Sequence, residues 1–229
     1  MTSRAIELRI AGVVFALLAV LFVAFPEVDL AASGAFYHNG RWAFSGGNWP
    51  FFELLYRGTP RVGQALLAIL AAGLLLGSIK RLFWLHARRA TFGFLLAAAL
   101  LGPVLLVDVT LKDGWHRARP ATVEAFGGPL KFTPAFVMTD QCPKNCSFVS
   151  GHVATAAFVM AFGWLAAPAV RRRWLLASLA TATLLAVVRM TAGGHFLSDT
   201  IFAWFAIYFS QWATEWAFRR LKWLQPTRE

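Results

Sequence analysis

Charged residues are scarce in this chain of 229 residues. Asp, Glu, Lys and Arg together make up 14% of it, whereas 58% is apolar and the mean hydropathy is +0.58. A water-soluble domain of this length needs far more polar surface, so the composition excludes one. Several apolar runs approach the roughly 20 residues that a helix needs to cross a bilayer. We therefore expect an all-α polytopic membrane protein whose single domain covers residues 1–229.

Acidic residues are also few, with 11 Asp and Glu against 22 Lys and Arg, and the formal net charge is +11. This charge could indicate a surface that binds nucleic acid. The excess of basic residues is instead concentrated in the segments expected on one side of the membrane. Those segments carry thirteen basic and three acidic residues, whereas the rest of the chain carries nine and eight. The thirteen are Arg4, Arg9, Lys80, Arg81, Arg88, Arg89, Arg171, Arg172, Arg173, Arg219, Arg220, Lys222 and Arg228; the three acids are Glu7, Glu215 and Glu229. This positive-inside bias predicts that both termini are cytoplasmic, and it leaves no role for a nucleic-acid partner.

Only two cysteines are present, Cys142 and Cys146, with Pro, Lys and Asn between them. Without other ligands nearby they make a poor metal site. They fall in the longest segment expected outside the cytoplasm, where an oxidising compartment allows a disulfide that stiffens the loop. Free thiols remain the alternative.

The apolar runs predict six membrane-spanning helices. Their approximate ranges are 10–25, 62–79, 91–109, 150–168, 174–188 and 195–218. Basic inner turns are expected at 80–89 and 171–173, and outer loops at about 26–61 and 111–149. The first outer loop is rich in Trp and Phe, which suit a membrane interface. A cleavable signal peptide would also explain the first run, but its length and the spans that follow favour a retained helix.

Three short segments at the outer ends of these helices hold a concentrated set of polar groups. They are residues 112–120, 150–152 and 189–199. Among their side chains are three cations, Lys112, Arg119 and Arg189. Because Lys and Arg are costly next to lipid, their convergence implies an anion, and phosphate is the natural one. Ser150 and Gly151 at a helix start would add backbone amides to this cradle.

Two histidines in these segments indicate chemistry as well as binding. His195 and Asp199 are spaced i, i+4, so Asp199 is expected to accept a hydrogen bond from the imidazole and make His195 a better nucleophile. His152 on another helix is placed to protonate a leaving oxygen. We interpret Asp108, Asp113 and His116, which also lie near the site, as loop or supporting groups.

The spacing of all three segments together is specific. The pattern Lys112-x6-Arg119-Pro120, then Ser150-Gly151-His152, then Arg189-x5-His195-x3-Asp199 resembles the tripartite signature of the type 2 phosphatidic acid phosphatase superfamily. The resemblance implies a six-helix lipid phosphatase in which His195 becomes a phosphohistidine and His152 is the acid. It also implies phosphate binding by Lys112, Arg119, Arg189, Ser150 and Gly151, with no metal and no other cofactor.

The chain departs from the family pattern at two positions. Val149 stands where Pro usually precedes Ser-Gly-His, and Val188 stands where Ser usually precedes the Arg. Neither change touches the nucleophile, so both bear on the substrate more than on the reaction.

These observations predict a lipid phosphatase of the bacterial inner membrane that works on its periplasmic face. The candidate substrates implied by the family are lipid A, undecaprenyl pyrophosphate, phosphatidylglycerol phosphate and phosphatidic acid. Lys131 and Lys144 in the second outer loop mildly favour a large headgroup, that of lipid A or a polyprenyl carrier. A lipid-to-lipid phosphotransferase and a non-catalytic lipid-phosphate binder or flippase remain alternatives, and the oligomeric state stays open.

Overall fold

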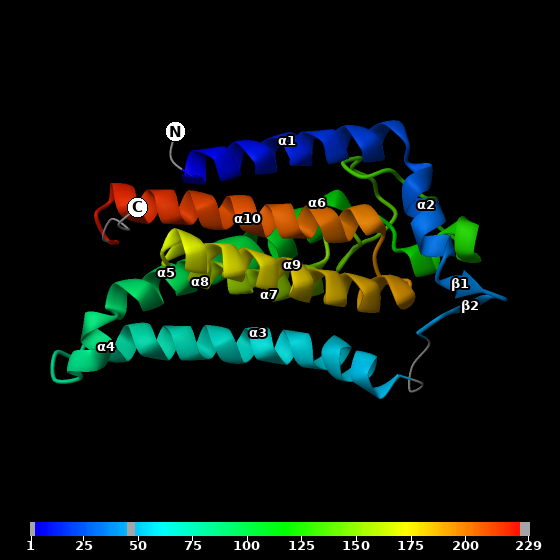
Figure 1. The fold of residues 1–229 in the computed structure, drawn as a ribbon. Helices are drawn as coiled ribbons and strands as arrows, with labels where there is room; N and C mark the ends of the chain where they lie inside the picture. Colours follow the sequence, from blue (N-terminus) through cyan, green and yellow to red (C-terminus); the bar gives the residue numbers. More distant parts are fainter. Residues whose placement is uncertain (1–2, 45–48, 225–229) are drawn as a thin grey trace.

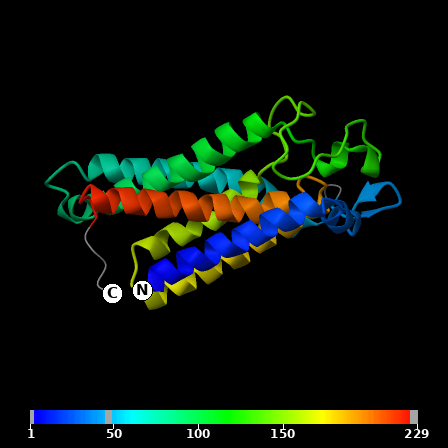
Figure 2. The same cartoon turned by 90° about the horizontal axis from the view of Figure 1, so that it is seen from above.

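The computed structural model describes residues 3–44 and 49–224, so Arg228 and Glu229 of the charge pattern lie outside the described residues. Long helices run side by side between two ends of the molecule (Figures 1 and 2). One end carries both chain termini and α4 (Phe83–Ala87), and the opposite end carries α2 (Glu27–Gly34) with a short hairpin. The hairpin pairs β1 (Tyr37–His38) with β2 (Arg41–Trp42) in antiparallel register.

The remaining helices follow the order of the predicted spans. They are α1 (Ser3–Ala24), α3 (Pro50–Leu76), α5 (Arg89–Ala99) continued by the π-helix η1 (Leu100–Lys112), α6 (Asp113–Trp115), the 3₁₀ turns η2 (Pro120–Thr122) and η3 (Glu124–Phe126), α7 (Gly151–Ala157) continued by η4 (Phe158–Met160) and α8 (Ala161–Trp164), α9 (Pro168–Thr191) and α10 (Leu197–Arg220).

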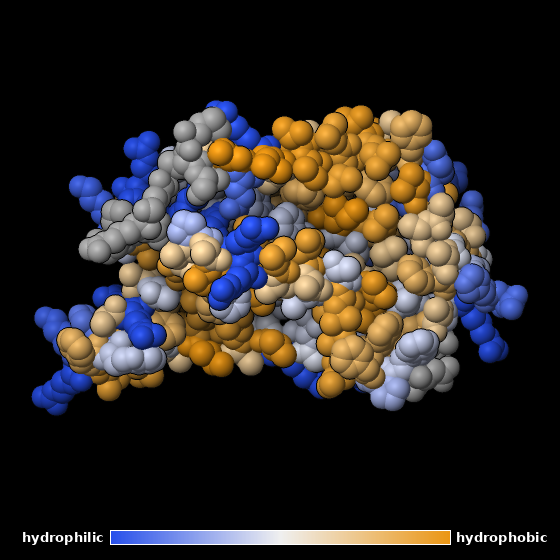
Figure 3. All heavy atoms as spheres, viewed as in Figure 1, coloured by the Kyte–Doolittle hydropathy of each residue, from blue (hydrophilic) through white to orange (hydrophobic). Residues whose placement is uncertain are grey.

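Four described segments are long and apolar enough to cross a membrane. They are Arg4–Ala24, Pro50–Leu76, Arg89–Thr122 and Pro168–Thr191, and a shorter apolar helix covers Gly151–Trp164. On the face drawn in Figure 3, apolar residues spread over the middle while hydrophilic residues project at both ends. This is the surface expected of helices immersed in lipid, and the chain is an all-α membrane protein. The number of six spans stays a prediction.

Helix α10 lies at the centre of the bundle, packed against η1, α7 and α9. Its Phe202 belongs to an aromatic cluster with Phe15 of α1 and Phe148. Phe136, from the long segment between η3 and α7, inserts its ring into the same cluster, 4.5 Å from the ring centre of Phe202. Edge-to-face aromatic contacts of this kind add to burial energy. The outer segment is therefore anchored in the bundle.

The first outer loop is shorter than the expected 26–61, so that prediction was wrong in its second half. Helix α3 begins at Pro50 and includes Phe51, Phe52 and Tyr56, whereas Trp42 and Trp49 lie before it. Proline favours the first turn of a helix because its missing N–H needs no partner there. Pro60 lies inside the helix without ending it.

The inner turn expected at 171–173 is also helical, because α9 starts earlier, at Pro168. Arg171 is buried there and donates two hydrogen bonds to Glu7 of α1, of 2.7 and 3.0 Å. Its guanidinium also lies 3.7 Å over the ring of Trp164. This basic residue therefore ties α1 to α9 at the end of the bundle that carries the termini.

Candidate active site

The structure brings the three predicted segments together at the end of the bundle that carries α2. Lys112 is the last residue of η1, Arg189 lies in the last turn of α9, and His195 stands just before α10. Arg119 donates to the Gly194 carbonyl at 3.5 Å, which links the first segment to the third. The residues that sequence reasoning placed in one site are therefore neighbours in space.

Two glycines allow this close approach. A Cβ built on Gly151 would lie 2.9 Å from the Lys112 Nζ, and one built on Gly194 would lie 2.3 Å from Arg189 Nη2. Real Cβ atoms do not tolerate such distances, so any side chain at either position would push a cation out of place. The glycines therefore act in the site by leaving room for the charges.

Ser150 caps the helical run that starts at Gly151, and its hydroxyl accepts a 3.5 Å bond from the Val153 amide. Its own amide donates to the Asp199 backbone carbonyl at 3.1 Å. Side-chain capping of this type satisfies an otherwise unpaired amide of the first turn. The start of α7 is thus fixed against the start of α10, and His195 lies just before α10.

Arg189 is 4% exposed and its guanidinium lies 4.7 Å over the ring of Tyr56 from α3. Its Nε has no hydrogen-bond partner within the described part of the chain. A buried donor without a partner is costly, so its presence indicates a ligand that supplies an acceptor.

His195 is 1% exposed, and its Nδ1 lies 2.7 Å from the Ser147 carbonyl oxygen. A carbonyl can only accept, so Nδ1 carries the proton and Nε2 of the neutral ring carries the lone pair. Burial lowers the pKa of the imidazole well below its ordinary value. The positive charges of Arg189, Arg119 and Lys112 lower this pKa further. The ring is therefore neutral at neutral pH, and its Nε2 lone pair is free.

Asp199 does not bond to His195 in the way the i, i+4 spacing suggested. Its Oδ2 lies 3.8 Å from His195 Nδ1, beyond hydrogen-bond range. This oxygen instead accepts from the Ser147 hydroxyl at 2.5 Å and from the Phe196 amide at 2.8 Å. Asp199 thus acts on the imidazole through Ser147, whose carbonyl holds Nδ1 and whose hydroxyl is held by the carboxylate.

His152 points toward α3. Its Nε2 lies 2.9 Å from the Tyr56 carbonyl oxygen, and its ring is stacked on the Tyr56 ring at 5.3 Å with 7° between the planes. Because a carbonyl accepts, Nε2 carries a proton in this arrangement. With only this proton the ring is neutral, so His152 can act as a general acid once Nδ1 also binds a proton.

Arg117 lies inside the first motif but was not recognised as important in the sequence. It is completely buried and pairs with two buried carboxylates, Asp29 of α2 at 2.9 Å and Asp199 of α10 at 2.6 Å. The backbone amide of Ser198 donates a hydrogen bond of 2.8 Å to Asp29 Oδ1. A buried cation between two anions is stable only when it is paired in this way. No sequence pattern links Asp29 to this site.

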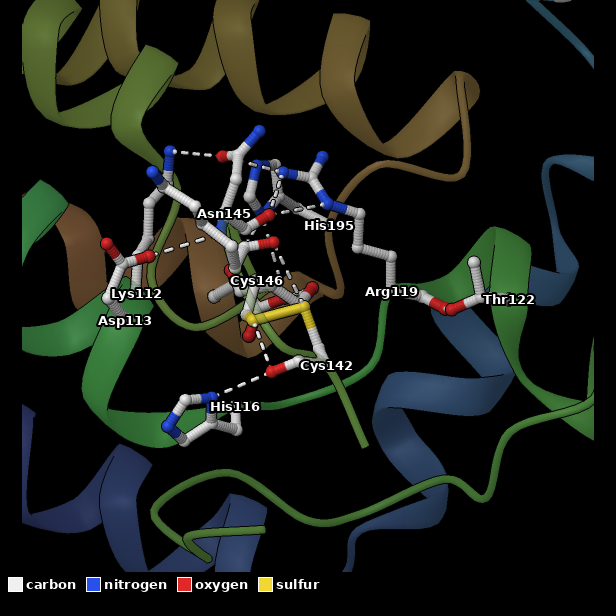
Figure 4. The surroundings of a disulfide bond; sticks show 12 residues. Lys112, Asp113, His116, Arg119, Thr122, Cys142, Asn145, Cys146 and His195 are labelled. Atoms are coloured by element: carbon white, nitrogen blue, oxygen red, sulfur yellow. Dashed lines mark hydrogen bonds and ion pairs between the residues drawn. A yellow bond between two sulfur atoms is a disulfide. The ribbon is translucent and has the colours of Figure 1, made fainter. Parts of the chain in front are cut away.

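Cys142 and Cys146 form a disulfide, and the small ring that it closes contains Asn145 (Figure 4). The Asn145 amide oxygen accepts from Lys112 Nζ at 3.1 Å and from Arg119 Nη2 at 3.1 Å. Tyr56, Asn145 and Ser147 are thus further members of the site that the sequence did not reveal. Among the described residues no group of three or more His, Cys, Asp or Glu side chains could hold a metal.

A cavity of about 320 Å³ leads from this site into the bundle. At the site its walls are formed by Lys112, Gly151 and His152, and deeper between α3, η1 and α7 they include Leu66 and Phe158. A polar end and an apolar end in one cavity match a ligand with a charged head and a hydrocarbon tail.

Comparison with known proteins agrees with this geometry. The profile of the PAP2 superfamily matches residues 61–222. A lipid A 4'-phosphatase of Francisella tularensis subsp. novicida (strain U112) is 36% identical over 197 residues, which cover 84% of this chain and 87% of the relative. A lipid A 4'-phosphatase of Rhizobium leguminosarum is 33% identical over 205 residues, covering 83% and 86%. No solved structure matches the chain.

Proposed function

Because this chain belongs to the PAP2 superfamily and is a membrane lipid phosphatase, we propose that it removes the 4'-phosphate of lipid A. Two similar proteins named for this activity match more than four-fifths of the chain. The long segment 111–149 adds a folded part beside the site, anchored by Phe136, that a large headgroup could contact.

One observation carries the assignment of roles: a neutral, buried imidazole faced by three cations. Lys112, Arg119 and Arg189 would bind the non-bridging phosphate oxygens and the charge that develops on them during transfer. The unpartnered Arg189 Nε supports this, because a phosphate oxygen would satisfy it. Ser150 and the Gly151 amide complete the proposed phosphate site at the start of α7.

The reaction then runs in two steps with His195 as the nucleophile. Its Nε2 attacks phosphorus, and the bond from phosphorus to the sugar oxygen breaks as the imidazolium form of His152 gives that oxygen a proton and becomes neutral. Water next attacks the phosphohistidine, His152 takes a proton from it, and inorganic phosphate leaves. Asp199 and Ser147 position the imidazole and do not touch the substrate. The residues provide every proton without a cofactor.

The cavity between α3, η1 and α7 offers a path for the lipid part. A phosphate beside Lys112 would leave the apolar portion near Leu66 and Phe158. Binding energy from this remote portion can position the phosphate for attack. The substrate would therefore enter from the bilayer.

We place the enzyme in the bacterial inner membrane with this site facing the periplasm. The basic residues of the positive-inside pattern support it: Arg171 and Arg219 belong to the end that carries the termini, opposite the site. Short basic segments are retained on the cytoplasmic side during insertion.

The test is phosphate release from a panel of lipid A, undecaprenyl pyrophosphate, phosphatidylglycerol phosphate and phosphatidic acid. We expect wild type to prefer lipid A and His195→Ala to lose about a thousandfold or more of the rate, as removal of a nucleophile does. His86→Ala is the matched control, because His86 lies in α4, at the end of the molecule opposite the site. Unchanged activity in His195→Ala would contradict the mechanism. Labelled phosphate recovered on another lipid would show transfer instead of hydrolysis.

A further inference from the structure

Asn145 lies between two of the cations that are proposed to bind phosphate (Figure 4). Its side-chain oxygen accepts from Lys112 Nζ at 3.1 Å and from Arg119 Nη2 at 3.1 Å. Its backbone oxygen accepts from Arg119 Nη2 at 2.6 Å and from Arg119 Nε at 3.1 Å. One residue thus presents two oxygens to two cations, as a phosphate would.

The chain holds Asn145 in this position by several independent contacts. The Cys142–Cys146 disulfide closes the ring around it, and the His116 Nδ1 donates to the Cys142 carbonyl at 2.7 Å. The backbone N–H of Asn145 donates to Asp113 Oδ1 at 3.1 Å. Its φ of 53° lies in the left-handed region, which Asn tolerates better than most residues. These contacts therefore fix the backbone of Asn145 beside the two cations.

The oxygens of Asn145 are neutral, and this limits how firmly they hold the cations. A phosphate dianion adds attraction between opposite charges to these hydrogen bonds, which a neutral amide oxygen cannot supply. A phosphate dianion would therefore displace Asn145. It must compete with Asn145 for the cations, because the disulfide ring holds this residue beside them at a high effective concentration. The affinity of the site for every phosphate ligand is lowered by the same factor.

We propose that Asn145 is a built-in, displaceable occupant of the phosphate site, which pairs Lys112 and Arg119 when the site is empty and competes with the inorganic phosphate product. This inference rests on the proposed function of the site. Substrate pushes Asn145 aside, and after hydrolysis the residue returns to the cations and speeds the departure of phosphate. The consequence is weaker product inhibition, obtained at the expense of a higher KM.

The test compares inorganic phosphate binding to purified full-length wild type, Asn145→Gly and Asn145→Asp. Glycine keeps the left-handed backbone and removes the side-chain oxygen, whereas aspartate adds a negative charge beside both cations. We expect phosphate to bind about fivefold more tightly to Asn145→Gly than to wild type, as expected for removal of one competing hydrogen-bonding group, and more weakly to Asn145→Asp. With lipid substrate, Asn145→Gly should lower KM and kcat together and be inhibited by less phosphate.

The sign of the change decides the matter. If Asn145 were a ligand of the phosphate, Asn145→Gly would bind phosphate more weakly, and an unchanged affinity would mean that the residue is inert; either result overturns the proposal. Reduction of the disulfide in wild type is an independent measurement on an unmutated chain. Tighter phosphate binding after reduction supports the role of the ring, and unchanged or weaker binding overturns it.

Binding and turnover separate this inference from the proposed function. Arg189→Gln should lose phosphate binding, which shows that the signal comes from this site. If Asn145→Gly binds phosphate more tightly while wild type releases none from lipid A, the substrate assignment fails and the occupant role stands. If wild type hydrolyses lipid A but Asn145→Gly does not bind phosphate more tightly, the occupant role fails alone.

Discussion

At the scale of single residues, charge and burial act together on the imidazole of His195, the proposed nucleophile. His195 is nearly inaccessible, and three cations face it. Both effects disfavour the protonated ring, so its pKa falls below the ordinary value and the lone pair on Nε2 remains available. The cations that would bind the substrate also keep the His195 ring neutral.

This gives a prediction for the pH dependence of kcat/KM. The neutral ring is the active form, so a lowered His195 pKa moves the acid limb of the profile below the ordinary histidine range. Arg119→Gln removes one of the three charges, so the pKa rises and the acid limb moves toward higher pH. The position of the limb is measured, and not the height of the profile, which also falls as binding weakens.

The matched control for that profile is Lys131→Gln. It removes an equal charge from the same outer segment, from a residue that does not contribute to the lowered pKa of His195. We expect its acid limb to coincide with that of wild type. The explanation fails if both variants shift equally, or if Arg119→Gln leaves the limb in place.

The residues that the sequence assigned to the site lie together in the structure, but some of their contacts differ from those expected. Lys112, Arg119, Arg189, His152 and His195 were found because each belongs to a short motif whose spacing is itself the signal. The partner of the His195 ring was not, because the spacing to Asp199 cannot show that the Ser147 carbonyl, 48 residues away, lies closer.

At the scale of helices, η1 decides where Lys112 lies. Its π-helical hydrogen bonds span five residues instead of four, so side chains advance around the axis at a different rate from those of an α-helix. A 3.6-residue period therefore does not predict which face carries Lys112. The sequence placed the residue at the correct end of its helix, and the direction of its side chain depended on the actual winding.

The packing of α3 against α5 is a second determinant at this scale. A Cβ built on Gly73 would lie 2.5 Å from the Phe92 ring, so the two helices approach as closely as they do only because the side chain is absent. We expect Gly73→Ala to lower the free energy of unfolding by about 1–3 kcal/mol through overpacking. Thermal unfolding in detergent measures this.

Gly58→Ala in the same helix is the control, since nothing lies within 4 Å of the added Cβ. Alanine has the better helix propensity, so this variant should be as stable as wild type or more so. Equal stability of the two variants would show that the Gly73 contact does not limit the approach of the helices.

At the scale of the whole molecule, the chain has two different ends. One carries the termini and the basic residues of α9 and α10, and the other carries the site, with Arg117 held between Asp29 and Asp199. Buried ion pairs contribute little net stability but are costly to break. This cluster therefore fixes α2 over the start of α10.

The two ends predict an orientation that reporter fusions can measure. Green fluorescent protein joined after residue 229 should fluoresce, and alkaline phosphatase joined there should be inactive, because the basic segments keep this end in the cytoplasm. Active alkaline phosphatase at the C-terminus would place the site on the cytoplasmic face and contradict the orientation. The measurement does not depend on enzyme activity.

The sequence by itself determined the class, the charge asymmetry and the chemical groups, because hydropathy, loop charge and motif spacing are properties of short stretches. It misjudged the start of α3 and α9, since aromatic residues before the second span and Arg residues at 171–173 indicated a loop and a turn, although both stretches are helical. Only the tertiary structure decided which atoms meet. The Lys112–Asn145 bond joins residues 33 apart, and the bond from Arg117 to Asp29 joins residues 88 apart. Such contacts depend on how all the helices pack together, which local patterns do not encode.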